Sequence, residues 1–510
     1  MRKWAIIAAG AFLPILIAIL VLGPGLHVFI RDRTENAFRS HFQSQLEFSD
    51  FQVSLFPRIH VTITGVVMRH QGRTDIPPLF QIQRLSMYAN LLSVLQPRPR
   101  IALVQLDGLQ IHTPPRQPGG TPLIQGTDEN LAKKYPVLIE EIRADNAVLA
   151  VLPAQTDKPA REFPIHHLLL RDLSFDGPAK FHATLTNAIP KGEIDSSGDF
   201  GPWAAETPAA TPVAGQYTFE NVDMGTLKGI GGIMSSTGSF KGPLDYMEVG
   251  GVTDIPNFSL RTADHPVALH TEFSAIVDGA NGDTYLKSVT ARFLHTTLSV
   301  SGEVVDVYQN VKGRTVVLDA TSQSARVEDM ITLAARGKDP VMTGSLRLKA
   351  KINIPEGNGD LIDRLRITGQ FGIGDVQFSS PAVQGKIDSL SRRGQGQPKD
   401  MEINDVASAM AVNLQVSRAV AHFSNLNFSV EGASIILAGS YNLDNGGLDF
   451  HGKLILQAKL SQTTTGVKSF FLKALDPFFK GKHAGAVVPI KITGTKDHPA
   501  FGLDLGHASD

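Results

Sequence analysis

The chain contains few residues whose types and spacing suggest chemistry. His166 and His167 are adjacent, so on a strand their side chains would lie on opposite faces and could not bind one metal ion together. The acidic loop 278–283 has oxygens suited to calcium. A twelve-residue calcium loop that starts at position 278 would end at Val289, however, where a bidentate glutamate is required. We therefore predict a plain turn here and no metal site.

Catalytic motifs are absent from the sequence, which contains no GxSxG elbow, no Walker-type phosphate loop and no HExxH motif. The glycine clusters 229–232 and 372–374 lack the third glycine of a dinucleotide-binding loop, and we interpret them as strand glycines that relieve twist or form bulges. The absence of cysteine excludes thiol nucleophiles, disulfides and cysteine-ligated zinc. We predict that the protein is not an enzyme and has no catalytic, cofactor-binding or metal-binding residues.

Composition indicates a folded chain without a nucleic-acid partner. Hydrophobic residues make up 42% of the 510 residues and charged residues 19%, which is sufficient for a large core. The 48 Lys and Arg residues are balanced by 49 Asp and Glu residues, for a net charge of -1. Because binding to a phosphate backbone needs a basic surface, this balance argues against nucleic acid.

The elements that must position any site are mainly strands. Apolar and polar residues alternate in Leu346–Ile354, Leu426–Val430, Leu448–Leu460 and Val488–Ile492, which is the pattern of half-buried antiparallel strands. The turn at Asp444–Gly447 has the residues that a hairpin needs. We predict a mainly β fold, with a long curled antiparallel sheet and a few short helices.

Other segments are assigned in the same way. Phe51–Val67 and Ile101–Ile111 alternate as strands, whereas Leu79–Leu95 and Val327–Ala335 have the wider apolar spacing of helices. Val467–Asp476 is also predicted to be helical and to end before Pro477. Its apolar side chains lie at near-helical spacing beside lysines, so this helix would either cap the sheet or lie on a membrane surface.

The N-terminus has the features of a membrane anchor. Arg2 and Lys3 precede the uncharged run Trp4–Leu22, which as a helix would be about 28 Å long and would span a bilayer. The positive-inside rule keeps these two cations in the cytoplasm and places the rest of the chain outside it. A cleaved signal peptide is the alternative, but the apolar run is longer than usual for one. The anchor residues are Trp4, Leu13, Ile17 and Leu22.

Breaks in composition suggest three regions. Residues 1–24 form the anchor and are followed by a linker helix predicted at Leu26–Leu46. Pro-, Gly- and Ala-rich stretches at 112–126 and 196–212 are predicted loops, and we divide the chain near residue 210. The predicted regions are therefore 1–24, 25–210 and 211–510.

Several segments resemble the AsmA-like bacterial envelope proteins, which are related to TamB and to the bridge-like lipid-transfer proteins. The segments that carry this resemblance are Leu55–His70 (LFPRIHVTITGVVMRH), Leu91–His112 (LLSVLQPRPRIALVQLDGLQIH), Gly231–Gly251 (GGIMSSTGSFKGPLDYMEVGG), Gly282–Phe293 (GDTYLKSVTARF), Ser469–Phe479 (SFFLKALDPFF) and Val487–Leu505 (VVPIKITGTKDHPAFGLDL). The chain is shorter than the longest members of that family, which makes lipid binding a safer expectation than a complete bridge.

The resemblance implies a β-groove, an inner-membrane anchor with a periplasmic body, and phospholipids as partners in outer-membrane lipid homeostasis. It implies no catalytic residues and no cofactor. The alternative is a structural or regulatory protein that affects outer-membrane protein assembly through contacts with an outer-membrane or periplasmic protein. The residues predicted to line the groove are Leu346, Leu348, Ile352, Ile354, Leu448, Phe450, Leu454 and Leu456. Alternation alone favours a closed sandwich core. The variant Leu456→Asp distinguishes an open groove from a closed core, because an open groove should tolerate the carboxylate and a closed core should not.

Overall fold

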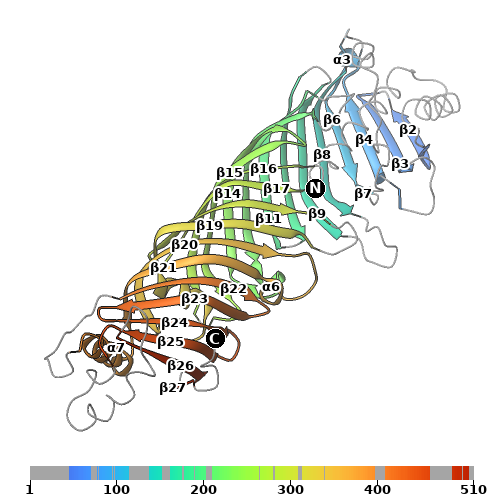
Figure 1. Ribbon diagram of the computed structural model, residues 1–510. Helices are drawn as coiled ribbons and strands as arrows, with labels where there is room; N and C mark the ends of the chain where they lie inside the picture. Colours follow the sequence, from blue (N-terminus) through green and yellow to red (C-terminus); the bar gives the residue numbers. More distant parts are fainter. Residues whose placement is uncertain are drawn as a thin grey trace. The chain divides into compact units, whose positions relative to one another are not determined.

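A computed structural model describes part of the chain between residues 45 and 504 (Figure 1). Within that span it leaves out 55, 70–76, 79, 95, 97, 114–136, 152–160, 175–176, 189, 203–209, 264, 280–281, 308–312, 338, 397–407, 460–484 and 497. The predicted anchor and the predicted helix at Val467–Asp476 lie outside the described residues. So does the predicted linker helix, except for its last two positions, which belong to strand β1.

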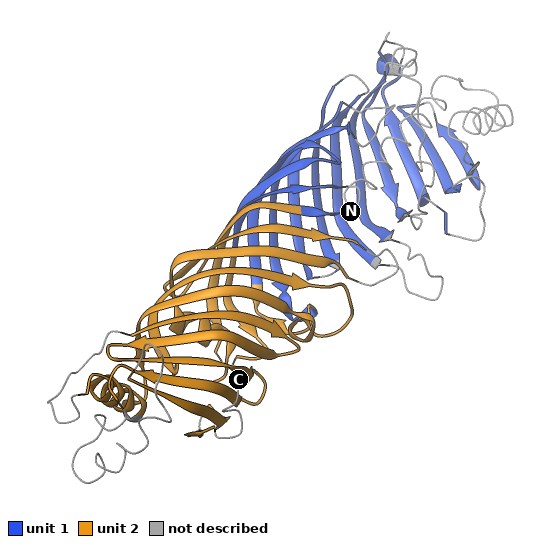
Figure 2. Cartoon of the chain, in the orientation of Figure 1, with its two compact units in different colours: residues 1–226, 234–253, 274–284 blue, residues 227–233, 254–273, 285–510 orange. Residues whose placement is uncertain are grey.

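The described chain is mainly β and divides into two compact units, coloured separately in Figure 2. Unit 1 comprises residues 1–226, 234–253 and 274–284, and unit 2 comprises 227–233, 254–273 and 285–510. Four strands contribute residues to both units: β14 (Ile233–Pro243), β15 (Met247–Leu260), β16 (Val267–Val277) and β17 (Thr284–Phe293). The units therefore interleave along the chain.

Unit 1 contains a mixed sheet rather than the purely antiparallel sheet that we predicted. Its strand β8 pairs in parallel with β5, β6 and β7, whereas its other pairs are antiparallel. The elements of this unit are β1 (Gln45–Glu47), β2 (Asp50–Ser54), β3 (Ile59–Arg69), β4 (Phe80–Ala89), α3 (Leu91–Val94), β5 (Arg100–Ile101), β6 (Leu103–Asp107), β7 (Gln110–Thr113), β8 (Leu138–Val151), β9 (Arg161–Leu173), β10 (Ala179–Ala188), β11 (Lys191–Phe200), β12 (Pro212–Asp223) and the 3-10 helix η3 (Met224–Thr226).

Unit 2 contains an antiparallel meander in which each strand from β18 to β27 pairs with the next. Its elements, besides β13 (Ile230–Gly231), are β18 (Thr296–Val305), β19 (Thr315–Arg326), α5 (Val327–Ala334), β20 (Met342–Ile354), α6 (Leu361–Arg364), β21 (Arg366–Phe378), α7 (Pro381–Gly394), β22 (Ala409–Ser417), β23 (Val420–Val430), β24 (Ala433–Asn442), β25 (Gly447–Leu456), β26 (Ala486–Thr495) and β27 (Pro499–Leu503).

The helix predicted at Leu79–Leu95 is wrong. Most of this segment is strand β4, and only its end forms the short helix α3. Buried side chains alternate up to Ile82 and then resume at Leu85, so the apolar positions shift parity once within the strand. The resulting spacing of three residues mimics the pattern of a helix, which explains the error.

Local patterns predicted unit 2 more accurately. Helix α5 begins at the predicted residue, Val327, and ends one residue early. Asn442 and the positive φ of Gly446 shape the predicted turn between β24 and β25, where the Asn442 side chain accepts hydrogen bonds from two backbone N–H groups. Helix α7 was not predicted, because Gly385 and a low apolar content obscure its helical spacing.

A closed apolar core lies on the β3–β9 sheet of unit 1. Ile82, Leu85 and Ile101 have no accessible surface, and other side chains of these strands pack around them. Such complete burial stabilises the fold by about 1.5 to 3 kcal/mol for each large aliphatic side chain. This region has the close packing expected of a structural core.

Candidate lipid-binding face

The apolar face of unit 2 is formed by alternate residues of neighbouring strands. Because the strands pair in register, these residues form rows that cross the sheet. One row contains Leu318, Ile352, Ile367, Val416, Ala421, Tyr441 and Leu448. The adjacent row contains Ala320, Ala350, Gly369, Leu414, Phe423, Gly439, Phe450 and Ile492. We call them the two apolar rows.

Strand β20 follows the predicted alternation. Leu346, Leu348 and Ala350 are buried, whereas Arg347 and the other cations of the strand, at 349 and 351, are exposed. Asn353 departs from this pattern, because the alternation of Leu346–Ile354 predicts that its side chain lies in water. The side chain is half-buried, and its Oδ1 is buried without a hydrogen-bond partner among the residues that the structure describes. The assignment of apolar positions to one face is therefore right, and one polar position behaves differently.

One end of the apolar face is covered by helices. Leu346, at 2% exposure, and Leu456, at 4%, belong to a buried cluster against which α5 and α7 pack. The helices contribute Met330, Ile331, Ile387 and Leu390. We call this the helix-covered cluster. Its buried members are Ala325, Val327, Leu346, Leu348, Ile373, Val376, Phe428, Val430, Ala433, Leu456 and Ala486.

The two apolar rows are less completely buried. Ile352, Ile367, Leu414, Phe423 and Leu448 are half-buried, and none belongs to the helix-covered cluster. Partly exposed aliphatic side chains in contiguous rows leave apolar surface that a ligand can cover. This surface is the site on which the functional argument rests.

A glycine shapes the centre of the second row. Gly439 lies between Phe423 and Phe450 in the register, and the ring centroids of the two phenylalanines are 5.4 Å apart. A Cβ atom at Gly439 would lie 2.1 Å from the backbone oxygen of Asp449. The glycine therefore permits close approach of β24 and β25 beneath an aromatic pair.

The eight predicted groove residues divide between these two environments. Leu346, Leu348, Phe450 and Leu456 are buried, whereas Ile352, Ile354, Leu448 and Leu454 are half-buried. Leu454 packs against the helix-covered cluster despite its partial exposure. Leu456 is thus a packing residue, and its substitution tests the stability of the cluster rather than the accessibility of the face.

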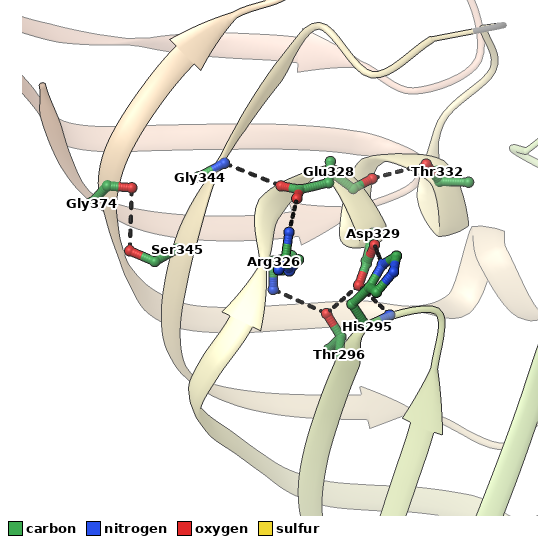
Figure 3. Close-up of polar contacts among 9 residues, drawn as sticks. All are labelled: His295, Thr296, Arg326, Glu328, Asp329, Thr332, Gly344, Ser345 and Gly374. Carbon is green, nitrogen blue, oxygen red and sulfur yellow. Dashed lines mark hydrogen bonds and ion pairs between the residues drawn. The ribbon is translucent and has the colours of Figure 1, made fainter. Parts of the chain in front are cut away.

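Helix α5 is attached to the sheet by two carboxylates in its first turn (Figure 3). Asp329 is 3% exposed, and its Oδ2 accepts hydrogen bonds from the backbone N of His295 at 2.9 Å and from Oγ1 of Thr296 at 2.8 Å. Glu328 Oε2 accepts a hydrogen bond from the backbone N of Gly344 at 3.1 Å. One helical turn therefore joins the β17–β18 turn to the start of β20.

Arg261 joins turns of unit 2 that are distant in sequence. Its Nη2 is 2.7 Å from Oδ1 of Asp363, its Nε is 3.4 Å from Oδ2 of Asp360, and Nη2 is 3.9 Å from Oδ1 of Asp444. Burial lowers the pKa of Arg261, but the hydrogen bond to Asp363 and the neighbouring carboxylates raise that pKa overall. We call this group the Arg261 seam. It connects the end of β15, helix α6 and the β24–β25 turn.

The prediction that His166 and His167 lie on opposite faces is wrong. A bulge in β9 lets His166 contact Oγ1 of Thr186 at 2.8 Å and His167 contact Oδ1 of Asp145 at 2.6 Å, so both imidazoles lie on the polar face. Among the described residues, no group of three or more His, Asp or Glu side chains is placed to hold a metal ion. The predicted turn at 278–283 contains a backbone hydrogen bond from Gly282 to Asp278.

Ile367, Leu414 and Phe423 belong to the apolar face but were not predicted from the sequence. Each lies in an alternating strand, so a signal was present, but cross-strand pairing was needed to join them into rows. The glycines at 372 and 374 lie within strand β21, in agreement with the interpretation of that cluster.

No helix in the described part of the chain is long and apolar enough to cross a membrane. Comparison with known proteins identifies no relative: no family model, no curated protein and no solved structure matches the chain. The resemblance to the AsmA-like proteins therefore stays a prediction, and the functional argument rests on the apolar face itself.

Proposed function

We propose that the apolar face of unit 2 binds the acyl chains of phospholipids, and that the protein serves outer-membrane lipid homeostasis. In this proposal Trp4–Leu22 anchors the chain in the bacterial inner membrane and the β-rich body lies in the periplasm. The fold assigned to this function is a curled sheet whose apolar side forms a groove. The proposal includes no reaction and no cofactor.

The observation that carries the proposal is the half-burial of five large side chains in the two apolar rows, Ile352, Ile367, Leu414, Phe423 and Leu448. An acyl chain is an unbranched apolar ligand, and each methylene that it transfers from water to such a surface contributes about 0.8 kcal/mol. The two apolar rows cross seven or more strands, and their Leu, Ile and Phe side chains offer this surface without any need for directional polar contacts. Binding that depends on apolar area also tolerates different lipid species.

The proposal is tested by Leu414→Asp beside the matched control Gln415→Asp, both in the full chain purified in detergent. Leu414 is half-buried on the apolar face, whereas Gln415 is its exposed neighbour on the polar face. Native mass spectrometry of the wild type and of Gln415→Asp should detect copurified phospholipid. The Leu414→Asp protein should lose it, because a carboxylate opposes acyl-chain contact.

A second variant distinguishes a loss of lipid binding from misfolding. Leu414→Trp adds apolar volume without a charge and should also reduce bound phospholipid if the surface beside Leu414 is accessible. Thermal unfolding of the wild type and of the three variants checks the fold. Repeated absence of phospholipid from the wild type, or undiminished phospholipid in both folded Leu414 variants, would overturn the proposal.

One observation favours a second candidate function, a structural or regulatory role through protein contacts. Phe501 and Leu503 on β27 are each 55% exposed, and the described chain pairs β27 with β26 alone. An apolar strand at the edge of a sheet is suited to pairing with another protein. In that case the Leu414 variants would bind no less phospholipid than the wild type.

A further inference from the structure

A depression of about 420 Å³ lies on unit 2, across strands β19–β23. Two rows of the sheet border it. Arg347, Gly372 and Ala411 are cross-strand neighbours in one row, and Lys349, Gln370 and Asn413 are neighbours in the other. The residues between these rows include Leu348 and Phe371, whose side chains pack in the helix-covered cluster on the apolar face. The depression therefore lies on the polar face of the sheet, opposite the candidate lipid-binding face.

The charge of this depression is positive. Arg347 and Lys349 are exposed, and within the described chain neither forms an ion pair with a carboxylate. None of the residues that line the depression is acidic. Cationic side chains that lack an internal partner are available to an anion, and the guanidinium of arginine matches the geometry of phosphate or carboxylate oxygens.

Four side-chain amides complete the lining. Gln323, Gln370, Asn413 and Asn425 border the depression, and no hydrogen bond within the described chain engages their amide groups. Asn425 lies at a bulge of β23 and has a φ of 52°, a conformation that asparagine tolerates better than most residues. Amides both donate and accept hydrogen bonds, so they suit a ligand with several hydroxyl groups.

Short residues keep the floor open. A Cβ atom at Gly372 would meet no atom within 4 Å, and its neighbour Ala411 has only a methyl group. A volume of this size falls within the range of small-molecule sites. It is large enough for a phosphorylated sugar.

A depression of similar size in unit 1 provides an internal comparison. It has a volume of about 520 Å³ and lies on the polar face of β11, β12, β14 and β15, but the residues that line it include no Lys or Arg. It contains Asp195, which is 3.0 Å from Nε2 of His182, together with hydroxyl side chains. A groove on the polar face therefore does not require cations, and their presence in unit 2 needs a separate explanation.

We propose that the unit 2 depression binds a phosphate-bearing polyol, with the phosphate between Arg347 and Lys349 and the hydroxyl groups bonded to the surrounding amides. Two kinds of molecule carry a phosphate together with hydroxyl groups: a soluble phosphorylated sugar and the glycerophosphate headgroup of an anionic lipid. This site is distinct from the candidate lipid-binding face, and it does not rest on acyl-chain binding there.

The test uses the full chain in detergent with glucose 6-phosphate, and compares the wild type with Arg347→Gln, Lys349→Gln and the control Lys453→Gln. Lys453 is an exposed cation on the same face of the sheet but does not line the depression. Calorimetry should show binding to the wild type and to the control. Each variant in the depression should bind about tenfold more weakly, because it loses a charge-assisted hydrogen bond to the phosphate.

Further ligands identify the source and the specificity. Glucose without phosphate should bind undetectably, and inorganic phosphate should bind more weakly than glucose 6-phosphate because it lacks the hydroxyl contacts. Phosphatidylcholine vesicles with and without phosphatidylglycerol test the lipid headgroup. Loss of vesicle binding in the Arg347 and Lys349 variants, with retention in the Lys453 variant, would assign the site to a lipid.

Two results would overturn the proposal. One is the absence of any binding of glucose 6-phosphate and of anionic vesicles to the wild type. The other is equal weakening in all three variants, which would reduce the effect to general surface charge. The substitutions exchange one exposed polar side chain for another, so unfolding is not expected to obscure the result.

Discussion

The closed core of β3–β9 in unit 1 and the two apolar rows of unit 2 have the same alternating pattern but differ in burial. Leu85 in the first has no accessible surface, whereas Leu414 in the second is half-buried. Alternation therefore specifies which residues share a face and leaves open whether that face is covered. In unit 1 the face contributes stability, and in unit 2 part of it remains accessible.

The largest effect is expected from a matched pair of truncations. Leu85→Ala should lower the free energy of unfolding by about 2–5 kcal/mol, because it leaves a cavity in a closed core. Leu414→Ala removes the same atoms from a half-buried position and should cost about 1 kcal/mol. Chemical denaturation of the two variants, monitored by far-UV circular dichroism, measures the difference. Equal losses would mean that the two regions are packed alike.

Asp329→Ala is expected to have an intermediate effect, confined to the covered end of the unit 2 face. It removes the acceptor from the backbone N of His295 and from the buried Thr296 hydroxyl, at a cost of about 2 kcal/mol. Loss of this attachment should loosen α5 and increase the binding of an apolar dye. Thr332→Ala, elsewhere on the same helix, is the control. Unchanged dye binding in the Asp329 variant would show that α5 stays in place without the carboxylate.

The smallest effect is expected from pH at the edge of unit 2. Nδ1 of His451 is 2.7 Å from Oδ2 of Asp504, and its Nε2 is 3.1 Å from Oδ1 of Asp449. The hydrogen bond to Asp504 raises the pKa of His451; burial opposes the shift, and Asp449 adds to it. Lys491, opposite His451 in β26, is the neighbouring cation.

A raised pKa means that the folded state favours the protonated imidazole. This stabilisation is complete below the ordinary pKa of about 6.5 and is lost as the pH rises through the raised value. Amide hydrogen exchange in β27, corrected for intrinsic rates, should therefore be slower at pH 6 than at pH 8. In His451→Gln the exchange rates of β27 at pH 6 and pH 8 should be equal after this correction. In the closed core of unit 1 the corrected rates should not differ between the two pH values. A difference that persists in the variant would assign the effect to another group.

Much of unit 2 could be predicted from local patterns. Leu346 and Leu348 share a face because strand side chains alternate, and α5 begins where the predicted helix does. In unit 1 the same reasoning failed at β4, where the change of parity between Ile82 and Leu85 resembles a helix. The parallel pairing of β8 was also missed, because pairing partners are set by chain topology rather than by local alternation.

The candidate site was predicted in part. Leu346 and Ile352 lie on the same strand and the same face, yet helices cover the first and leave the second half-buried. That distinction depends on where helices α5 and α7 pack on the sheet, and the alternation of a strand does not specify this. The cationic depression was missed for a related reason, since Arg347 and Lys349 become neighbours of Gln370 and Asn413 only through pairing.

The Arg261 seam has a consequence for the order of folding. Arg261 and Asp363 are 102 positions apart in the sequence, and Asp444 lies further towards the C-terminus. When synthesis reaches Arg261, none of these carboxylates exists, so the contact closes a long loop after the intervening hairpins have formed. Contacts of such separation carry a large loop-closure entropy and slow folding. A chain that stops before Asp360 would keep its early hairpins but would have no means of closing the seam, which makes the seam a late marker that unit 2 is complete.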